Sequence, residues 1–300
     1  MSSPIQEIKS DFLLEKEIRL FIKRDDLLNP HISGNKFRKL KYNLECARKE
    51  GHDTLLTFGG AYSNHLYAVA AAGVLHGFKT IGIIRGEKYH SLNPTLSFAS
   101  SKGMELHYVS REKYRGKNSE LFRKKLNEQF GRFYLLPEGG SNVEAVRGCT
   151  EIIQELDVDF DIFAVCCGTG GTMAGILAGL DANKYVVGFP VLKNGDFLKK
   201  DISHLIRSYN EKVYLNWHLE TGYHFGGYAR YSIELINFIN EFKQQFQIPL
   251  DPIYTGKMMY GIFDLLKKGS FKRGEKILAI HTGGLQGIKG FNERFGDLIL

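Results

Sequence analysis

The chain has 300 residues, of which 43% are hydrophobic and 24% charged, enough for one large or two modest domains with buried cores. No apolar run approaches the length of a membrane span, and the N-terminal segment lacks the apolar core of a signal sequence, so we expect a cytoplasmic protein without a membrane partner. The net charge of +7 is diffuse, and its densest run, residues 111–125, is interrupted by Glu112 and Glu120. This run indicates the solvated face of a helix rather than a nucleic-acid surface.

The expected elements alternate between strands and helices along the chain. A first helix is predicted over residues 37–49. Strands are then predicted at 54–58, 80–85, 105–109, 133–136, 162–166, 185–189 and 276–280, and helices at 64–76, 94–102, 118–130, 143–156, 172–180, 232–246 and 257–268. This alternation predicts right-handed crossovers and an α/β fold of open, twisted, mostly parallel sheets. We expect two domains: a small one over residues 49–150, and a large one formed by residues 1–48 and 151–300.

Lys36 is the first candidate for chemistry, because it follows the turn Ser33-Gly34-Asn35 and opens the first predicted helix. A lysine at such a junction is aimed by the backbone, and a buried lysine can lose its proton near neutral pH and act as a nucleophile. This suggests Schiff-base chemistry and a pyridoxal 5'-phosphate (PLP) enzyme. Most lysines are solvated, so the interpretation also requires a phosphate site and a substrate pocket.

A glycine-rich loop, Cys167-Gly168-Thr169-Gly170-Gly171-Thr172, lies between a predicted strand and a predicted helix. Glycines let backbone N–H groups approach an anion, and the helix N-terminus adds positive potential. A P-loop would need a lysine before its Ser or Thr, and a dinucleotide fingerprint would need glycine at Met173. The loop therefore predicts another kind of phosphate site, with a packing turn as the alternative.

A second strand-to-helix loop is Gly59-Gly60-Ala61-Tyr62-Ser63-Asn64-His65. Ser63 is a natural helix N-cap, and the helix N-terminus behind it suits a substrate carboxylate. The alternative is that Ser63 only caps its helix. We favour the anion site, because capping alone would not call for two preceding glycines.

Two later segments, 251–257 (DPIYTGK) and 281–284 (HTGG), also carry polar side chains. Tyr254 is either an acid or base or a packed ring, and Thr282 either donates to a ring nitrogen or caps a helix. We interpret His281 as a structural histidine. The spacing of the four cysteines and ten histidines indicates neither a disulfide framework nor a metal site.

Five segments match a known family in order along the chain. They are Gly34-Asn35-Lys36-x-Arg38-Lys39-Leu40, Ser63-Asn64-His65, Gly168-Thr169-Gly170-Gly171-Thr172, Asp251-Pro252-x-Tyr254-x-Gly256-Lys257 and His281-Thr282-Gly283-Gly284. Together they resemble the PLP-dependent 1-aminocyclopropane-1-carboxylate (ACC) deaminase / D-cysteine desulfhydrase family, which has the tryptophan-synthase-β-like fold (PLP fold type II). The resemblance covers nearly the whole chain.

The resemblance implies a role for each matching residue. Lys36 would form the Schiff base with PLP and later move the α-proton, and Asn64 would bond the phenolic oxygen of the cofactor. The phosphate would be held by Gly168, Thr169, Gly170, Gly171 and Thr172. Ser63, Asn64 and His65 would bind a small amino-acid substrate, with Ser63, Tyr254 and Tyr228 as further catalytic residues. The resemblance also implies a homodimer.

Two positions discriminate within the family. ACC deaminases typically carry glutamate at the position of Thr255 and leucine at the position of Thr282. Here the neutral Thr282 looks like the partner of the pyridine nitrogen, which weakens the electron sink and suits simple elimination. The family also usually has an arginine soon after Ser-Asn-His, where this chain continues with residues 66–68 (LYA).

The resemblance therefore favours D-cysteine desulfhydrase-like β-elimination or deamination, giving a keto acid and ammonia, with sulfide from D-cysteine. ACC deamination is the alternative. A non-catalytic PLP- or anion-binding protein on the same scaffold is the alternative from another class.

Overall fold

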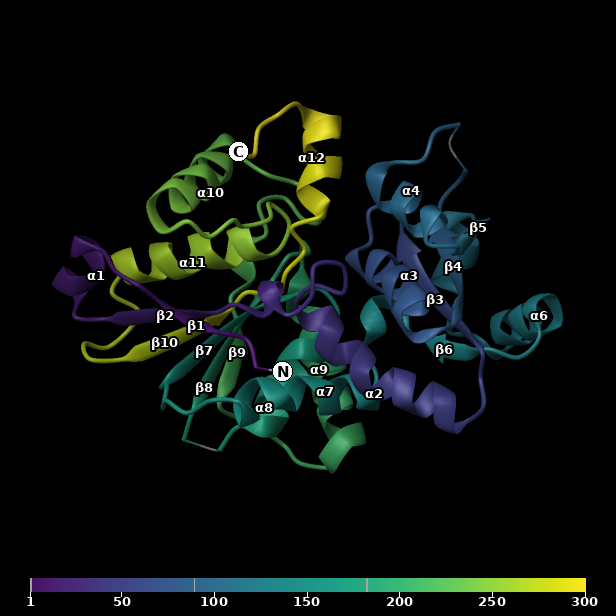
Figure 1. Cartoon of the computed structure of the whole chain (residues 1–300). Coiled ribbons are helices and arrows are strands. Elements are labelled where there is room, and N and C mark those ends of the chain that lie inside the picture. Colours follow the sequence, from purple (N-terminus) through teal and green to yellow (C-terminus); the bar gives the residue numbers. More distant parts are fainter. Residues whose placement is uncertain (1, 89, 182) are drawn as a thin grey trace.

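The computed structural model describes residues 2–88, 90–181 and 183–300 and places their strands in two sheets (Figure 1). Within these ranges the larger sheet has six strands in the order β1-β2-β10-β7-β8-β9, and the smaller has four in the order β5-β4-β3-β6. Every strand pair is parallel except β1 with β2. The predicted α/β class with mostly parallel sheets is confirmed.

The larger sheet is buried on both faces. Its strands are β1 (Ile5–Ile8), β2 (Arg19–Lys23), β7 (Ile162–Cys167), β8 (Tyr185–Pro190), β9 (Trp217–Leu219) and β10 (Lys276–Ile280). One face packs on α1 (Asp11–Lys16), α10 (Ile233–Phe246), α11 (Thr255–Lys267) and α12 (Gly287–Phe295). The other face packs on α7 (Val143–Gln154), α8 (Gly171–Gly179) and α9 (Leu198–Asn210). Two covered faces explain the continuous apolar runs of β7 and β8.

The smaller sheet lies beside the larger one in Figure 1. It consists of β3 (Thr54–Gly60), β4 (Lys79–Arg85), β5 (Glu105–Val109) and β6 (Tyr134–Leu136), with helices α3 (Asn64–His76), α4 (Pro94–Ser101), α5 (Arg111–Arg115) and α6 (Glu120–Phe130). The alanine-rich α3 is buried between the sheet and α4. We propose that the sheets mark two domains, residues 49–150 and residues 1–48 with 151–300; α7 straddles the second boundary.

Helix α2 (Asn35–Lys49), which begins at the predicted nucleophile, is anchored by a buried ion-pair network. Arg38 donates to Asp25 at 2.6 Å and to Glu155 on α7 at 2.8 Å. Lys23, at the end of β2, also pairs with Glu155, at 3.0 Å. The side chains of Lys23 and Asp25 are fully buried, so their charges are compensated within the network, and each also forms a hydrogen bond with Ser3. The network fixes the first turn of α2 against both β2 and α7.

Several elements differ from the sequence predictions. The helix predicted over residues 118–130 is preceded by a separate short helix, α5, and Ser119 caps α6 with its side chain. The sequence did not indicate β1, α1, β2, α9, β9 or α12. Short strands such as β9, with three residues, carry too little hydrophobic periodicity to be recognised.

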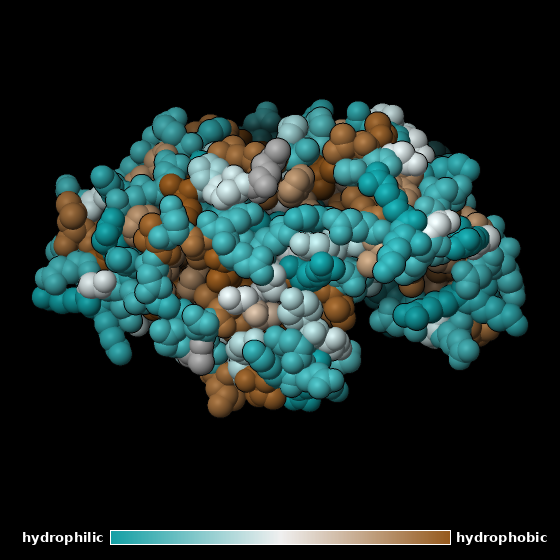
Figure 2. All heavy atoms as spheres, turned by 60° about the horizontal axis from the view of Figure 1, so that its bottom comes forward, coloured by the Kyte–Doolittle hydropathy of each residue, from teal (hydrophilic) through white to brown (hydrophobic). Residues whose placement is uncertain are grey.

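The surface is consistent with the composition of the chain. The face shown in Figure 2 is mostly hydrophilic, with hydrophobic side chains in separate patches. Among the helices of the described ranges, none is both long and apolar enough to cross a membrane.

Candidate active site

A cavity of about 1620 Å³ is lined by residues at the carboxyl ends of strands from both sheets. Ligands of parallel α/β sheets bind at such strand ends. The lining includes these residues predicted from the sequence: Lys36, Ser63, Asn64, His65, Gly168, Thr169, Gly170, Thr172, Tyr228, Tyr254 and Thr282. Gly171 is buried behind the lining, at the start of α8. The structure thus brings together side chains that lie more than 200 residues apart in sequence.

The turn before Lys36 packs against the loop that carries Thr282. Gly34 has a positive φ of 63°, and a Cβ there would lie 1.8 Å from the carbonyl oxygen of Thr282. The backbone N–H of Asn35 donates to that same oxygen at 3.2 Å. Only glycine fits this close approach. The contact holds the first turn of α2, and with it Lys36, next to Thr282.

The surroundings of Lys36 favour the neutral form of its amine. Its Nζ donates to the carbonyl oxygen of Gly139 at 3.3 Å, and the Nζ of Lys39 donates to the same oxygen at 3.2 Å. Burial, and then the charge of Lys39, hold the pKa of Lys36 well below its ordinary value. An amine that is unprotonated near neutral pH is a nucleophile and a base.

The glycine-rich loop forms an anion cradle around the N-terminus of α8. Asn35 Nδ2 donates to Thr172 Oγ1 at 2.8 Å, which ties the loop to the start of α2. A Cβ on Gly171 would lie 2.6 Å from Ser141 Oγ and 3.0 Å from the Nζ of Lys39, so the space depends on glycine. The Nζ of Lys39 thus lies beside the backbone cradle; burial lowers its pKa, and an anion bound in the cradle would favour its charged form.

Lys39 and Ser141 are site residues that sequence reasoning missed. The Nζ of Lys39 donates to Ser141 Oγ at 3.0 Å, and Ser141 Oγ lies 2.6 Å from Thr169 Oγ1. The position of Lys39 could have been predicted, because residues three positions apart share one face of a helix and Lys39 follows Lys36 by three positions. For Ser141 the sequence carried no signal, since its partner is 102 residues away.

The loop before α3 forms another wall of the cavity. Ser63 Oγ accepts a hydrogen bond from the N–H of Leu66 at 3.3 Å, so the residue caps α3 while its hydroxyl proton stays free to donate. A Cβ on Gly284 would lie 2.8 Å from Asn64 Nδ2, which places this amide against the loop after β10. Both the capping and the anion-site interpretations of Ser63 are compatible with this geometry.

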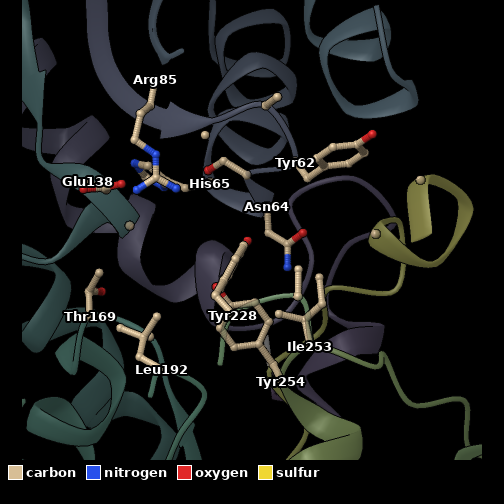
Figure 3. A pocket seen from close by; sticks show the side chains of 18 of the residues that line it. Tyr62, Asn64, His65, Arg85, Glu138, Thr169, Leu192, Tyr228, Ile253 and Tyr254 are labelled. Carbon is tan, nitrogen blue, oxygen red and sulfur yellow. The ribbon is translucent and has the colours of Figure 1, made fainter. Parts of the chain in front are cut away.

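His65 is an orphaned polar side chain on this wall (Figure 3). It is 2% exposed, and neither ring nitrogen has a hydrogen-bond partner among the residues that the structure describes. Burial holds the pKa of His65 well below its ordinary value, so the ring is neutral. A buried histidine without a partner beside a cavity is consistent with a ligand that fills the cavity.

Tyr254 and Tyr228 stand over the glycine-rich loop, as Figure 3 shows. A Cβ on Gly168 would lie 3.2 Å from Tyr254 Cε1, and the two tyrosine rings meet edge to face with centroids 6.1 Å apart. Desolvation raises the pKa of both phenols, and that of Tyr254 is raised well above its ordinary value. Both therefore keep their protons at neutral pH and can act as acids.

The loop that carries Tyr228 is held by Lys257. Phe225, Gly226, Gly227 and Ala229 all have positive φ. The Nζ of Lys257 donates to the carbonyl oxygens of His224 and Gly227 at 2.9 and 2.8 Å. Lys257 belongs to the segment 251–257 that the sequence analysis identified. Its role in holding the Tyr228 loop could be recognised only from the fold.

The two discriminating threonines lie in different surroundings. Thr282 lines the cavity, and its Oγ1 lies 3.0 Å from Cys166 Sγ. Burial raises the pKa of Cys166 to about 12, so the thiol stays protonated and can donate to Thr282. Thr255 faces away from the cavity: its Oγ1 donates to Asp251 Oδ1 at 2.8 Å and accepts from the N–H of Asp251 at 2.9 Å.

Four further residues clarify the sequence predictions. Tyr67, where the family's arginine is missing, stacks on Phe98 with centroids 3.7 Å apart and is not part of the cavity lining. His281 is buried and bonds the carbonyl oxygen of Pro249 at 2.8 Å, as a structural histidine would. Arg111 is exposed on α5, as a solvated helix face requires, but Arg111 and Lys117 also line the cavity.

The residues present fit PLP. The cradle at the N-terminus of α8, with Lys39 beside it, suits a phosphate. Lys36 supplies a neutral amine in the same cavity, and the orphaned His65 stands on its wall. Lys36, the glycine-rich loop, Asn64 and Thr282 are the residues that we propose hold the cofactor.

Comparison with known proteins agrees with this geometry. Residues 4–283 match the family described as "Pyridoxal-phosphate dependent enzyme". The chain is 33% identical over 295 residues to the bifunctional D-cysteine desulfhydrase/1-aminocyclopropane-1-carboxylate deaminase, mitochondrial, of Arabidopsis thaliana, covering 90% of this chain and 73% of the relative.

Solved structures show the same fold. An ACC deaminase homologue superposes with a TM-score of 0.86 at 30% identity, over 100% of this chain and 94% of the homologue. An O-ureido-L-serine synthase shares the fold with a TM-score of 0.69 at 14% identity, over 95% and 90% of the two chains. The chain therefore belongs to the family of pyridoxal-phosphate dependent enzymes.

Proposed function

We propose that this protein catalyses β-elimination from a small amino acid and releases a keto acid and ammonia. The reaction is of the D-cysteine desulfhydrase type, in which D-cysteine and water give pyruvate, ammonia and hydrogen sulfide. The observation that carries the proposal is the neutral amine of Lys36, placed in one cavity with an anion cradle and two protonated tyrosines. PLP, when bound, supplies an electron-accepting ring that stabilises negative charge at the substrate Cα.

The binding roles follow from the walls of the cavity. The backbone N–H groups of residues 168–172 and the ammonium of Lys39 bind the cofactor phosphate. The free hydroxyl proton of Ser63 and the N-terminus of α3 bind the substrate carboxylate. Asn64 and His65 complete that wall.

The proton transfers use two kinds of side chain. Lys36 Nζ, once free of the cofactor, takes the proton from the substrate Cα, because its pKa is held low by burial and by Lys39. Tyr254, whose pKa is raised, keeps its proton and delivers it to the departing β-substituent. Tyr228 faces Tyr254 edge-on and lies on the same side of the cavity.

Thr282 supports elimination over cyclopropane opening. Its neutral hydroxyl, adjacent to the protonated thiol of Cys166, can donate to the pyridine nitrogen but does not protonate it as a carboxylic acid would. Thr255, which replaces the glutamate of ACC deaminases, is engaged within its own loop. ACC deamination is the second candidate function, supported by the names of the relatives.

A substrate screen tests the proposal. Purified PLP-loaded protein is incubated with D-cysteine, L-cysteine, D-serine and ACC, and keto acid and ammonia are measured. We expect release from D-cysteine to exceed release from ACC, and the Lys36→Ala variant to release neither. Preferred turnover of ACC would favour the second candidate, and bound PLP without turnover of any small amino acid would contradict catalysis. The homodimer remains a proposal that depends on the resemblance.

A further inference from the structure

Arg85 is a cation in the active-site cavity that has no role in the chemistry described above. It is the last residue of β4, and it pairs in register with Gly60 on β3 and with Val109 on β5. It therefore lies at the carboxyl end of the small sheet, beside the loop that leads to Ser63. Figure 3 shows its guanidinium extending into the pocket.

The guanidinium is oriented along the sheet edge and into the cavity. A Cβ on Gly60 would lie 3.4 Å from Arg85 Nη2, so the side chain lies over this glycine. Its Cζ also lies 5.7 Å from the ring centroid of Tyr114, which is 3% exposed. Arg85 is exposed, so its guanidinium is accessible to a ligand that enters the cavity.

The guanidinium has no anionic partner of its own. Among the described residues, none forms a hydrogen bond or an ion pair with Arg85. The nearby carboxylate of Glu138 is paired with Lys117 Nζ at 3.1 Å, and Lys117 Nζ also lies 4.9 Å from the centroid of the Tyr114 ring. Arg111 and Glu87 line the same part of the cavity. Of the two carboxylates, Glu138 is therefore already paired with Lys117, and Arg85 is left without an ion-pair partner among the described residues.

This cation lies next to the proposed reaction centre. Glu138 directly precedes Gly139, whose carbonyl oxygen accepts from Lys36. Gly60 is three residues before Ser63, the proposed ligand of the α-carboxylate. A substrate held at Lys36 and Ser63 would therefore occupy the same cavity as Arg85.

We propose that Arg85 is a specificity residue that binds a second anionic group on the substrate, so that the preferred substrates are amino acids with a negatively charged substituent on Cβ. The inference depends on the proposed amino-acid chemistry at Lys36. A planar guanidinium with free N–H donors binds carboxylate, sulfonate or phosphate oxygens in a bidentate manner.

Isothermal titration calorimetry of the PLP-loaded protein tests this, with aspartate and asparagine as a pair that differs in charge but hardly in shape. Both enantiomers are titrated, and neither amino acid needs to react for its affinity to be measured. We expect the protein to bind aspartate about tenfold more tightly than asparagine, the size of one charge-assisted hydrogen bond. Arg85→Gln should abolish the preference, and Arg85→Lys, which keeps the charge, should retain part of it.

A matched control is Arg123→Gln, which removes an exposed arginine on α6 outside the cavity lining and should leave the preference unchanged. Equal affinities of the unaltered protein for the two ligands, or no binding of either, would overturn the proposal. Equal weakening of both ligands by Arg85→Gln would also overturn it, because it would assign Arg85 to the α-carboxylate. If no keto acid were released in the substrate screen, the proposed elimination would be contradicted. The ratio of the aspartate and asparagine affinities could still be measured, so the two proposals can fail separately.

Discussion

Lys257 is a buried cation whose partners are backbone carbonyl oxygens rather than a carboxylate. Its side chain holds the loop of positive-φ residues that presents Tyr228 to the cavity. Desolvation lowers the pKa of Lys257 to about 8, only partly offset by the charge of Asp251. Protonation of the Lys257 amine is thus less favourable in free energy in the folded protein than in the unfolded chain.

The sign of the resulting pH dependence follows from linkage. Between about pH 8 and the ordinary lysine value of 10.5, the unfolded chain binds more protons at this residue than the folded protein. The contribution of Lys257 to the free energy of unfolding therefore rises with pH across this window. We expect chemical denaturation to show this rise in the unaltered protein and its loss in Lys257→Met. The control Lys267→Met, exposed on the same helix, should keep the rise, and an identical pH dependence of all three proteins would refute the assignment.

Some site residues could be predicted from the sequence because their signal is local. Lys36 follows a glycine turn, and residues 168–172 form a glycine-rich loop at a helix start, so neighbours in sequence suffice to recognise them. Lys39, Ser141 and Arg85 could not be predicted in the same way. Their roles depend on partners far away in sequence, such as Gly139 for Lys39, 100 residues away.

At the scale of elements, the position of α2 is decided by charge rather than by apolar packing alone. Arg38 is bonded to Asp25 on one side and to Glu155 of α7 on the other. Hydrogen bonds and charges from Arg38 and Lys23 outweigh burial and lower the pKa of Glu155 to about 2. The start of α2 is thereby joined to β2 and α7.

Removal of Arg38 should therefore destabilise the protein strongly. Arg38→Met leaves the buried carboxylate of Asp25 uncompensated, and the expected loss is about 3–5 kcal/mol. Urea denaturation measures it, with Arg48→Met on the exposed side of the same helix as control, expected to cost less than about 1 kcal/mol. A midpoint for Arg38→Met equal to that of the unaltered protein would show that the network does not anchor α2.

Elements were predicted well where periodicity or caps were strong. The predicted helix over residues 64–76 and the strand over residues 105–109 have the observed bounds. The elements before residue 17 were missed, because β1 has four residues and α1 six. Such short elements are stabilised by pairing and packing, which a local pattern does not reveal.

At the scale of the whole molecule, the reaction site arises only when the two sheets face one cavity. Lys36 and the glycine-rich loop come from the part around the larger sheet, whereas Ser63, His65 and Arg85 come from the smaller sheet and its loops. Neither sheet alone carries the proposed nucleophile, the phosphate cradle and the carboxylate site together. The α/β pattern indicated this class of fold, but the juxtaposition of the two sheets follows from packing.

The central claim is that Lys36, and not the neighbouring Lys39, bonds the cofactor. The most direct measurement is borohydride reduction of the PLP-loaded protein, followed by peptide mapping of the attached label. The account predicts that the label is attached to Lys36. In Lys36→Ala both the label and the visible absorbance of the bound cofactor should be lost. In Lys39→Met the label should remain on Lys36, because this substitution weakens only phosphate binding. A label on Lys39, or an unchanged label and spectrum in Lys36→Ala, would contradict the account.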